Sequence, residues 1–409
     1  MVQLGTLNEV PVGVLGATGT VGQRFIKLLA VHPFFRIIAL GASQRSAGQP
    51  FYKAVAGRWK QVTPIPASIR DIVVQECIPE HFSSCAIVFS GLDADVAGDI
   101  GAYLIGILCR LPTESFCDKH AHKYFLPHGA IELAFRRAEL AVFSNAKNHR
   151  RDPQTPLIVP LVNTSHFSII PYQRSIQNPP IRKGFIVTNA NCSTTGLVVP
   201  LAALEKKYGP LDAVLCTTMQ SISGAGYPGV SSMDIMDNIV PYIGGEEEKM
   251  EWETAKILGG ISATTSADGT SVEVFDLHGD SPLRISAQCN RVPVIEGHTE
   301  TVSVRFAKRP PPSPQQVREA LAEYTCEAQS LHVPSAPTHA ITVHEDNDRP
   351  QPRLDRDFEE GAGVHVGRVR QCPVLDIKFV ILVNNVAIGA ATSSIINAEV
   401  AIAKDAVVL

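Results

Sequence analysis

Several features that would assign this chain to a particular class of protein are missing from its sequence. Lysine and arginine form no blocks and the formal net charge is −4 at pH 7, so the charge distribution gives no indication of nucleic acid binding. The longest nearly uncharged apolar stretch in the first half, residues 100–109, is too short to cross a bilayer. No internal repeat occurs. We therefore predict a protein that binds neither nucleic acid nor membrane.

Paired cysteines are also missing. The nine cysteines are widely spaced and no CxxC motif occurs, which disfavours a zinc site or a dithiol redox motif. A chain of 409 residues does not need disulfide bonds for stability, so we predict no metal and a reducing compartment. Residues 1–10 contain no basic region followed by an apolar run, so no signal peptide is expected and the predicted location is the cytoplasm.

The first half of the chain has the pattern of a nucleotide-binding α/β domain. An apolar run at 12–15 ends in a glycine turn, residues 21–30 have helical spacing, and 35–40 form a second apolar run. A strand, a glycine turn, a helix and a strand within about 30 residues are typical of a βαβ unit. Further buried strands are predicted at 87–89, 140–143 and 184–188.

The second half mixes strands and helices without regular alternation. We predict an α/β fold, with a Rossmann-type doubly wound parallel sheet and a mixed α+β catalytic and dimerisation domain. The predicted domains are 1–190, to which 386–409 returns, and 191–385. The expected strands are 213–219, 272–275, 284–288 and 301–306, the helices 246–258 and 313–324, a strand and an Ala-rich helix within 379–409, and the proline-rich surface loops 310–312 and 350–352.

A glycine-rich loop, Gly16 to Gly22 with the spacing GxxGxxG, joins the first predicted strand to the first helix. Glycines let the backbone approach a pyrophosphate, and a helix N-terminus supplies N–H donors. The second strand is followed by no Asp or Glu, the usual partner of the ribose in an NAD site. Ser43 and Arg45 are instead suited to a 2′-phosphate, which favours NADP. The alternative is that Arg45 is a solvated loop residue.

Cys192 lies where a predicted strand meets an apolar helical pattern, with Ser193 or Thr194 as the expected N-cap. A helix N-terminus favours the thiolate, which is the nucleophilic form of cysteine. The alternative is a buried structural cysteine. His298 is the best candidate for the base, although Arg291, seven positions earlier, would lie on the opposite face of a continuous strand. A turn at Glu296 and Gly297 would bring both side chains toward one pocket.

Two further segments could belong to a binding site or have an ordinary structural role. The small residues at 220–226 permit close approach to a cofactor or substrate, or form an ordinary turn. Glu246 and Lys249 share one face of the predicted helix. They either belong to a binding site or lie in a solvated first turn of the helix, where acidic residues interact favourably with the helix dipole.

Together these stretches resemble the aspartate-β-semialdehyde dehydrogenases, and residues 350–356 point to the fungal or archaeal-type branch. The resemblance covers most of the chain and is specific at 13–19, 144–148, 191–194, 222–226, 251–254 and 288–292. It implies an NADP-dependent enzyme that forms homodimers or homotetramers and uses a small-molecule substrate and inorganic phosphate. Reductive dephosphorylation of L-aspartyl 4-phosphate to L-aspartate 4-semialdehyde would proceed reversibly through a cysteine thioester, in lysine, methionine, threonine and isoleucine biosynthesis.

The resemblance also implies roles for individual residues. Cys192 is matched to the nucleophile, His298 to the acid/base and Gln220 to the residue that orients the reacting group. Arg291 is matched to the arginine that binds the substrate α-carboxylate, for which a bidentate fork is suited. The other implied substrate-binding residues are Asn191, Glu246 for the amino group, and Arg150 and Lys249 for phosphate. The implied cofactor-binding residues are Gly16, Thr18, Gly19, Thr20, Val21, Ser43, Arg45, Ser90, Gly91, Ser223, Gly224 and Asn385.

Residues 101–131 depart from the family pattern and are expected to be an additional segment, either a surface loop or a misassigned coding segment. Its cysteines and histidines, at 109, 117, 120, 122 and 128, fit no zinc template.

Two alternative functions stay open: a related acyl-CoA or N-acetylglutamyl-phosphate reductase, and a non-catalytic NADP-binding protein disabled by the additional segment. The retained Cys192 and His298 argue against the second alternative.

Overall fold

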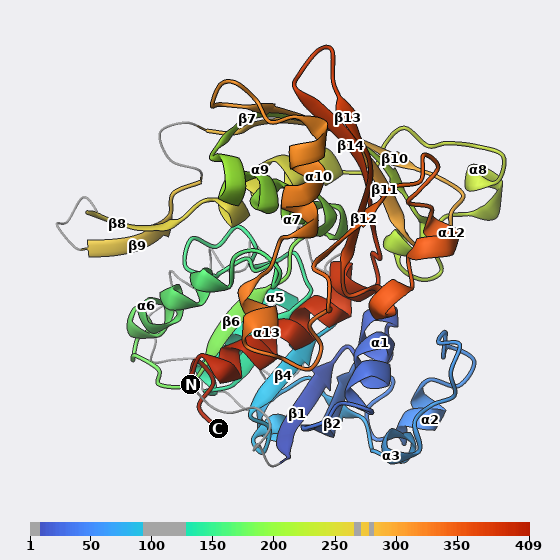
Figure 1. The fold of residues 1–409 in the computed structure, drawn as a ribbon. Helices are drawn as coiled ribbons and strands as arrows, with labels where there is room; N and C mark the ends of the chain where they lie inside the picture. Colours follow the sequence, from blue (N-terminus) through green and yellow to red (C-terminus); the bar gives the residue numbers. More distant parts are fainter. Residues whose placement is uncertain (1–8, 93–127, 266–270, 278–281) are drawn as a thin grey trace.

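The computed structural model describes residues 9–92, 128–265, 271–277 and 282–409. Two six-stranded sheets dominate the architecture (Figure 1). Residues 101–127 of the additional segment lie outside the described residues, and His128 begins helix α5 (His128–Arg137).

The first sheet is parallel and has the strand order β3-β2-β1-β4-β5-β6. The order reverses between β1 and β4, which creates a crevice at the carboxyl ends of the strands. This sheet confirms the predicted Rossmann-type half of the fold. Its strands are β1 (Val10–Leu15), β2 (Phe35–Ala42), β3 (Gln75–Glu76), β4 (Ile87–Ser90), β5 (Ala141–Ser144) and β6 (Phe185–Thr188).

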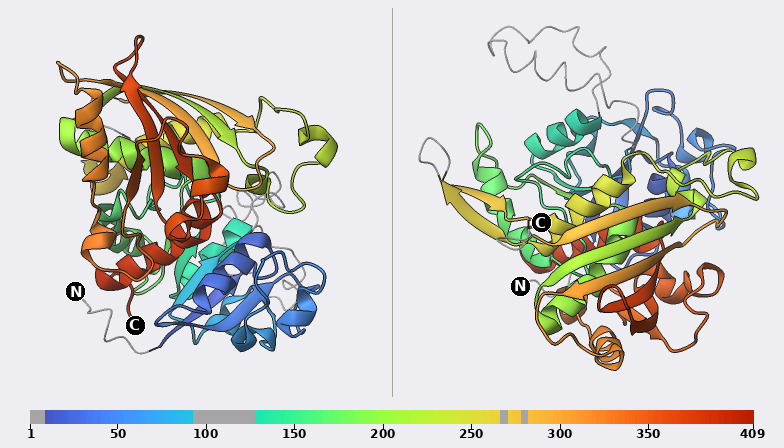
Figure 2. Two further views of the ribbon diagram at one scale, coloured as in Figure 1. Left: turned by 45° about the vertical axis from the view of Figure 1, so that its right-hand side comes forward. Right: turned by 90° about the horizontal axis from the view of Figure 1, so that it is seen from above.

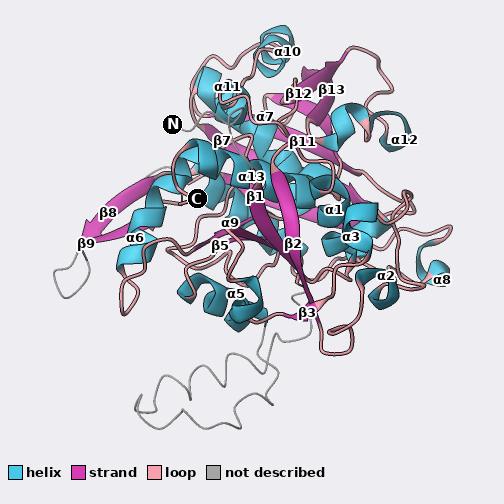
Figure 3. Ribbon diagram, turned by 90° about the horizontal axis from the view of Figure 1, so that it is seen from below, coloured by secondary structure: helices cyan, strands magenta, loops and turns pink. Residues whose placement is uncertain are grey.

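Both faces of this sheet are buried because successive side chains point to opposite sides. In β5, Phe143 belongs to the core under α1 (Thr20–Leu29) and α13 (Thr392–Ala403), whereas Val142 belongs to a smaller core with Phe135 of α5. Figure 3 shows α13 and α5 on opposite sides of the strands. The near-continuous apolar strands in the sequence follow from this double burial.

The second sheet is mixed, with the order β10-β7-β11-β14-β13-β12. Its outer pairs β10–β7 and β12–β13 are parallel and its inner pairs are antiparallel, as expected for the mixed α+β half of the fold. A separate hairpin of β8 (Ile261–Thr265) and β9 (Ser271–Phe275) projects from the molecule (Figure 2). The sheet comprises β7 (Leu211–Gln220), β10 (Arg284–Arg291), β11 (His298–Phe306), β12 (Ile341–His344), β13 (Val364–Gln371) and β14 (Ile377–Val383).

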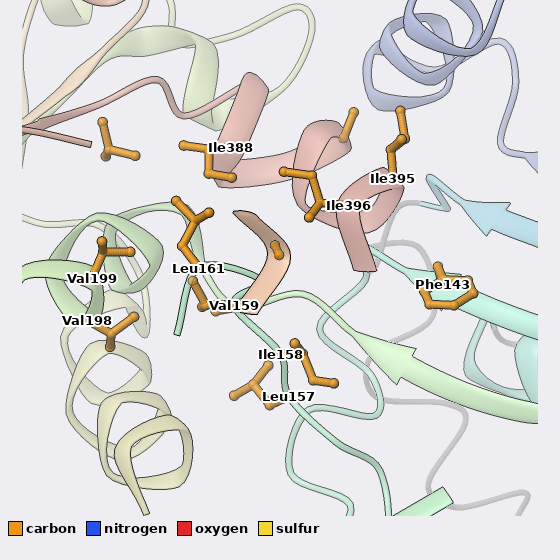
Figure 4. Close-up of a cluster of buried hydrophobic side chains, with 14 of the residues drawn as sticks. Phe143, Leu157, Ile158, Val159, Leu161, Val198, Val199, Ile388, Ile395 and Ile396 are labelled. Carbon is orange, nitrogen blue, oxygen red and sulfur yellow. The ribbon is translucent and has the colours of Figure 1, made fainter. Parts of the chain in front are cut away.

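Helix α7 (Cys192–Tyr208) lies at the centre of the molecule, in contact with the second sheet and with α9 (Glu246–Leu258). Val198 and Val199 of α7 belong to the same buried core as Ile388 and Ile396, near α13 (Figure 4). A helix that is apolar on all sides must be enclosed. Burial of α7 therefore fixes the place of its first residue, Cys192, between the two sheets.

The remaining helices are short, and one prediction about them is wrong. Residues 310–312 form a surface loop as expected, but Pro350 is buried and Pro352 begins α12. Among the described residues, no helix is both long and apolar enough to cross a membrane. The other helices are α2 (Phe51–Ala54), α3 (Ala67–Arg70), α6 (Ile170–Ser175), α8 (Ser232–Ile235), α10 (Pro314–Ala322), α11 (Glu327–Ser330), α12 (Pro352–Asp355), η2 (Pro79–Phe82), η5 (Thr164–Ile169), η6 (Ile222–Ala225), η7 (Phe358–Gly361) and the π-helix η8 (Ala387–Ala391).

The tight packing of the glycine-rich loop gives a test of the fold. A Cβ on Gly22 would lie 2.2 Å from the carbonyl oxygen of Gly16, whereas the nearest atom to a Cβ on Gly19 is 3.4 Å away. Gly22→Ala should lower the free energy of unfolding by about 3 kcal/mol because backbone must move, while Gly19→Ala should change it little. Urea denaturation of both variants measures this, and equal stabilities would contradict the packing described.

Candidate active site

A large cleft of about 2690 Å³ runs between the two sheets. The glycine-rich loop forms one end of it, and Cys192 lies in its wall. Most of the predicted site residues line the cleft, whereas Ser90, Gln220 and His298 are buried behind its surface. The residues that line it are Gly16, Thr18, Gly19, Thr20, Val21, Ser43, Arg45, Gly91, Arg150, Asn191, Cys192, Ser223, Gly224, Glu246, Lys249, Arg291 and Asn385.

The loop at the start of α1 has the features of an anion cradle. Gly16 has a φ of +68°, and a Cβ at this position would lie 2.6 Å from the carbonyl oxygen of Gly91. The N-cap of α1 is Gly19, which has no side chain to cover the first-turn N–H groups. These donors at the positive end of the helix dipole are suited to a pyrophosphate. Ser43 and Arg45 are exposed at the same end of the cleft.

Cys192 is the first residue of α7, and the predicted N-cap is wrong. The cap is Asn191, whose side-chain oxygen accepts hydrogen bonds from the N–H groups of Ser193 and Thr194 at 2.9 and 3.2 Å. Ser193 and Thr194 lie inside the first turn. Asparagine is among the best capping residues, and Asn191 has the non-helical conformation (φ −56°, ψ 148°) that a cap requires.

The nucleophile and the candidate acid/base are in contact, because Sγ of Cys192 lies 3.2 Å from Nε2 of His298. Arg291 ends β10 and His298 begins β11, with a bend at Gly297 (φ +97°) between them. Both side chains converge on Gly224, where an added Cβ would lie 2.9 Å from Arg291 Nη1 and 3.0 Å from His298 Cε1. The predicted turn does bring the two side chains together, with Arg291 in the wall of the cleft and His298 buried behind it.

The hydrogen bonds of His298 determine which ring nitrogen carries the proton. The main-chain N–H of Ser221 points at Nδ1 from 3.0 Å. A main-chain N–H can only donate, so Nδ1 is the acceptor and the neutral ring carries its proton on Nε2, facing the sulfur of Cys192. The geometry thus favours the proton-donating half of the predicted acid/base role.

Burial opposes the charged forms of both members of this pair. Burial raises the pKa of the Cys192 thiol to about 12, with a further increase from Glu246, against the opposing influence of Arg291 and Arg150. Burial and the charge of Arg291 lower the pKa of His298 to about 3. Burial thus opposes the thiolate that the helix N-terminus favours.

Glu246 lies at the centre of a hydrogen-bonded cluster next to the thiol. Its Oε1 accepts hydrogen bonds from Asn191 Nδ2 at 2.6 Å and Gln220 Nε2 at 3.0 Å, and its Oε2 pairs with Lys249 at 3.1 Å. Burial alone would raise the pKa of Glu246, but Lys249 and these donors lower it overall. Glu246 is thus an anion that faces the cleft.

Cations surround the same end of the cleft. Arg150 donates from Nη1 to Glu253 Oε1 at 2.9 Å and from Nη2 to the carbonyl oxygen of Asn145 at 3.2 Å. Its Nε–H has no hydrogen-bond partner among the described residues. Arg150, Lys249 and Arg291 together make this end of the cleft suited to a small substrate with more than one anionic group.

Two residues of this site were missed in the sequence. Ser221 orients His298 through its main-chain N–H, which no side-chain pattern can reveal. Glu253 is fully buried and bonds both Arg150 and the main-chain N–H of Asn191. Its spacing of seven from Glu246 is a signal, since positions i and i+7 share a helix face.

Comparison with known proteins agrees with these features. Residues 11–106 match the family described as "Semialdehyde dehydrogenase, NAD binding domain", and residues 201–388 match "Semialdehyde dehydrogenase, dimerisation domain". The chain is 59% identical to aspartate-semialdehyde dehydrogenase of Cryptococcus neoformans over 97% of this chain and 98% of that protein. For the same enzyme of Schizosaccharomyces pombe the identity is 52%, over 96% and 98%.

A solved structure is also similar over its whole length. It is aspartate semialdehyde dehydrogenase with NADP from Candida albicans, which superimposes with a TM-score of 0.80 at 48% identity and covers 98% of this chain and 100% of that one.

The tautomer of His298 can be tested directly. In the ligand-free protein labelled with ¹⁵N-histidine, NMR should show a pyridine-like Nδ1 and a pyrrole-like Nε2, because Ser221 donates to Nδ1. With its pKa lowered to about 3, the ring should stay neutral from pH 8 down to about pH 5. His298→Gln identifies the signal by removing it. A pyrrole-like Nδ1, or titration near the ordinary histidine pKa, would contradict the assignment.

Proposed function

The chain belongs to the aspartate-semialdehyde dehydrogenase family, and we propose that it catalyses the family's reaction through a thioester on Cys192. The observation that carries the proposal is the 3.2 Å contact between Cys192 Sγ and His298 Nε2 in the wall of the cleft. In the biosynthetic direction L-aspartyl 4-phosphate is reduced to L-aspartate 4-semialdehyde and phosphate is released. The opposite direction forms aspartyl phosphate from the semialdehyde and phosphate, and its steps begin with Cys192.

NADP is the proposed cofactor, and when bound it supplies or accepts the hydride. Residues of the glycine-rich loop would hold its pyrophosphate, while Ser43 and Arg45 would bind the 2′-phosphate. Ser223, Gly224 and Asn385 would line the cleft nearer to Cys192. Ser90 is fully buried and does not line the cleft, so its proposed part is to support the neighbouring Gly91.

The charged residues are proposed to divide the substrate between them. Arg291 binds the α-carboxylate and Glu246 the amino group, while Arg150 and Lys249 bind phosphate. The amino group would cancel the charge of Glu246, which contributes to the raised pKa of the Cys192 thiol. Substrate binding therefore favours the thiolate at the moment when it is needed.

The thiol proton of Cys192 passes to solvent as the substrate binds, the resulting thiolate attacks the aldehyde carbon, and the carbonyl electron pair moves to oxygen. The Nε2–H of His298 points to the sulfur that has just bonded to carbon, which supports its role as the hydrogen-bond donor to the new oxyanion. As this oxyanion re-forms the carbonyl, hydride leaves the carbon and a thioester remains on Cys192. The step needs no proton transfer to His298, which agrees with the lowered pKa of that residue.

Phosphate completes the cycle. An oxygen of the bound phosphate attacks the thioester carbon, the carbon–sulfur bond breaks, and aspartyl phosphate forms as the released thiolate takes up the phosphate proton and becomes the thiol again. The fixed guanidinium of Arg150, held by Glu253 and Asn145, supports a role in placing that phosphate.

The family's dimerisation domain matches this chain over residues 201–388, consistent with a homo-oligomer, and we propose a homodimer or a homotetramer. All seven cysteines among the described residues are unpaired, which supports a reducing compartment, proposed to be the cytoplasm. The division into a cofactor domain (1–190 and 386–409) and a catalytic domain (191–385) also remains a proposal.

Removal of the nucleophile tests the covalent route. Cys192→Ala should lower kcat for NADPH formation from aspartate semialdehyde, NADP and phosphate by about four orders of magnitude or more, because no thioester can form. Cys77→Ala, at a cysteine that also lines the cleft, serves as the control and should keep most of the activity. Near wild-type turnover in Cys192→Ala would disprove the mechanism.

Removal of Arg45 tests the cofactor preference. Arg45→Ala should raise the KM for NADP by about tenfold to a hundredfold, as expected for the loss of a charge-assisted hydrogen bond, and should leave the KM for NAD nearly unchanged. Arg70→Ala is the matched control, since Arg70 is exposed outside the cleft. Parallel changes for both cofactors would rule out contact with the 2′-phosphate.

A further inference from the structure

Glu253 is a fully buried carboxylate to which the mechanism above gives no chemical step. Its Oε1 accepts a hydrogen bond from Arg150 Nη1 at 2.9 Å, and its Oε2 accepts one from the main-chain N–H of Asn191 at 2.7 Å. Asn191 immediately precedes Cys192 and caps α7. The Glu253 side chain therefore connects Arg150, the proposed phosphate-binding cation, to the residue next to the nucleophile.

Only a carboxylate satisfies both partners. The Arg150 guanidinium and the Asn191 N–H are both donors, and a carboxylate has two acceptor oxygens and no proton to donate. With Nη1 bound to Glu253 and Nη2 bound to the Asn145 carbonyl, the guanidinium cannot rotate. Arg150 lines the cleft, so its charge is thereby kept at a fixed place beside an anion bound there, while its Nε–H is itself buried and has no partner in the described part of the chain.

The same face of α9 also holds the backbone that carries Arg150. Lys256 donates from Nζ to the carbonyl oxygens of Arg150, Asp152 and Thr155 at 2.8, 2.9 and 2.9 Å. Glu246, Lys249, Glu253 and Lys256 follow at helical spacing, so they share one side of α9. The first turn faces the substrate end of the cleft, and the following turns hold Arg150 by its side chain and its main chain.

We propose that Glu253 is a positioning residue for the phosphate half of the reaction. It holds the Arg150 guanidinium at a fixed place relative to Cys192, so that bound phosphate meets the thioester carbon. This inference rests on the proposed function. In this proposal Glu246 binds the substrate, whereas Glu253 positions Arg150. Loss of Glu253 should therefore affect thioester cleavage more than thioester formation.

The test is Glu253→Gln, which keeps the shape of the side chain but turns one acceptor into a donor. With NADP and aspartate semialdehyde alone, the burst of NADPH that reports thioester formation should keep its amplitude and change its rate by no more than about twofold. In steady state the KM for phosphate should rise by about tenfold or more, because the guanidinium is no longer held. Glu253→Asp, which keeps the charge but is shorter, should give a smaller increase.

The matched control is Glu251→Gln, the same change on the same helix. Glu251 is half-buried and accepts a hydrogen bond from the Ala287 N–H at 3.2 Å, outside the cleft, so its substitution should alter neither the burst nor the KM for phosphate. Equal losses in burst rate and phosphate turnover would show that Glu253 only stabilises the fold and would overturn the proposal. An unchanged KM for phosphate would overturn it as well.

Direct binding separates this inference from the proposed function. If wild-type protein forms no NADPH from aspartate semialdehyde, the proposed reaction fails, and calorimetric titration with inorganic phosphate still tests Glu253. Weaker binding to Glu253→Gln than to wild type would support the positioning role, and equal binding would refute it. Circular dichroism verifies folding, and if Glu253→Gln does not fold, the same measurements on Glu253→Asp decide the question.

Discussion

The hydrogen bond from the Ser221 main chain to His298 is the constraint on which the proposed chemistry depends. Because a main-chain N–H cannot reverse its direction, Nδ1 must accept and Nε2 must carry the proton that faces Cys192. Burial and Arg291 keep the ring neutral. The pair is therefore suited to act as a nucleophile and a hydrogen-bond donor for a developing oxyanion.

The surroundings of Cys192 are controlled by α9 as much as by α7, the helix on which it lies. Glu246 bonds the side chain of Asn191 while Glu253 bonds its main chain, so two carboxylates of one helix fix the residue that precedes the nucleophile. Such support keeps reacting groups in place without rearrangement during the reaction. It also places buried negative charge beside the thiol, and this contributes to its raised pKa until a bound cation cancels it.

Much of the fold could be predicted because its signals are local. Double burial produced continuous apolar strands, and α1 and α9 were found within one residue of the predicted ranges. The wrong predictions concern residues whose burial or capping role depends on where they lie in the folded chain. Pro350 is buried although proline-rich segments usually lie at the surface, and the cap of α7 is Asn191 because the helix already begins at Cys192.

The sequence by itself determined the glycine-rich loop, the absence of an acid after the second strand, and a cysteine at the start of a helix. Each depends on neighbours within one turn or one strand, which act before the chain folds. Only the tertiary structure decided that Cys192 contacts a histidine 106 positions away, that burial opposes the charged form of each, and that Glu253 holds Arg150. Desolvation and long-range hydrogen bonds exist only when distant segments pack together, so no local pattern encodes them.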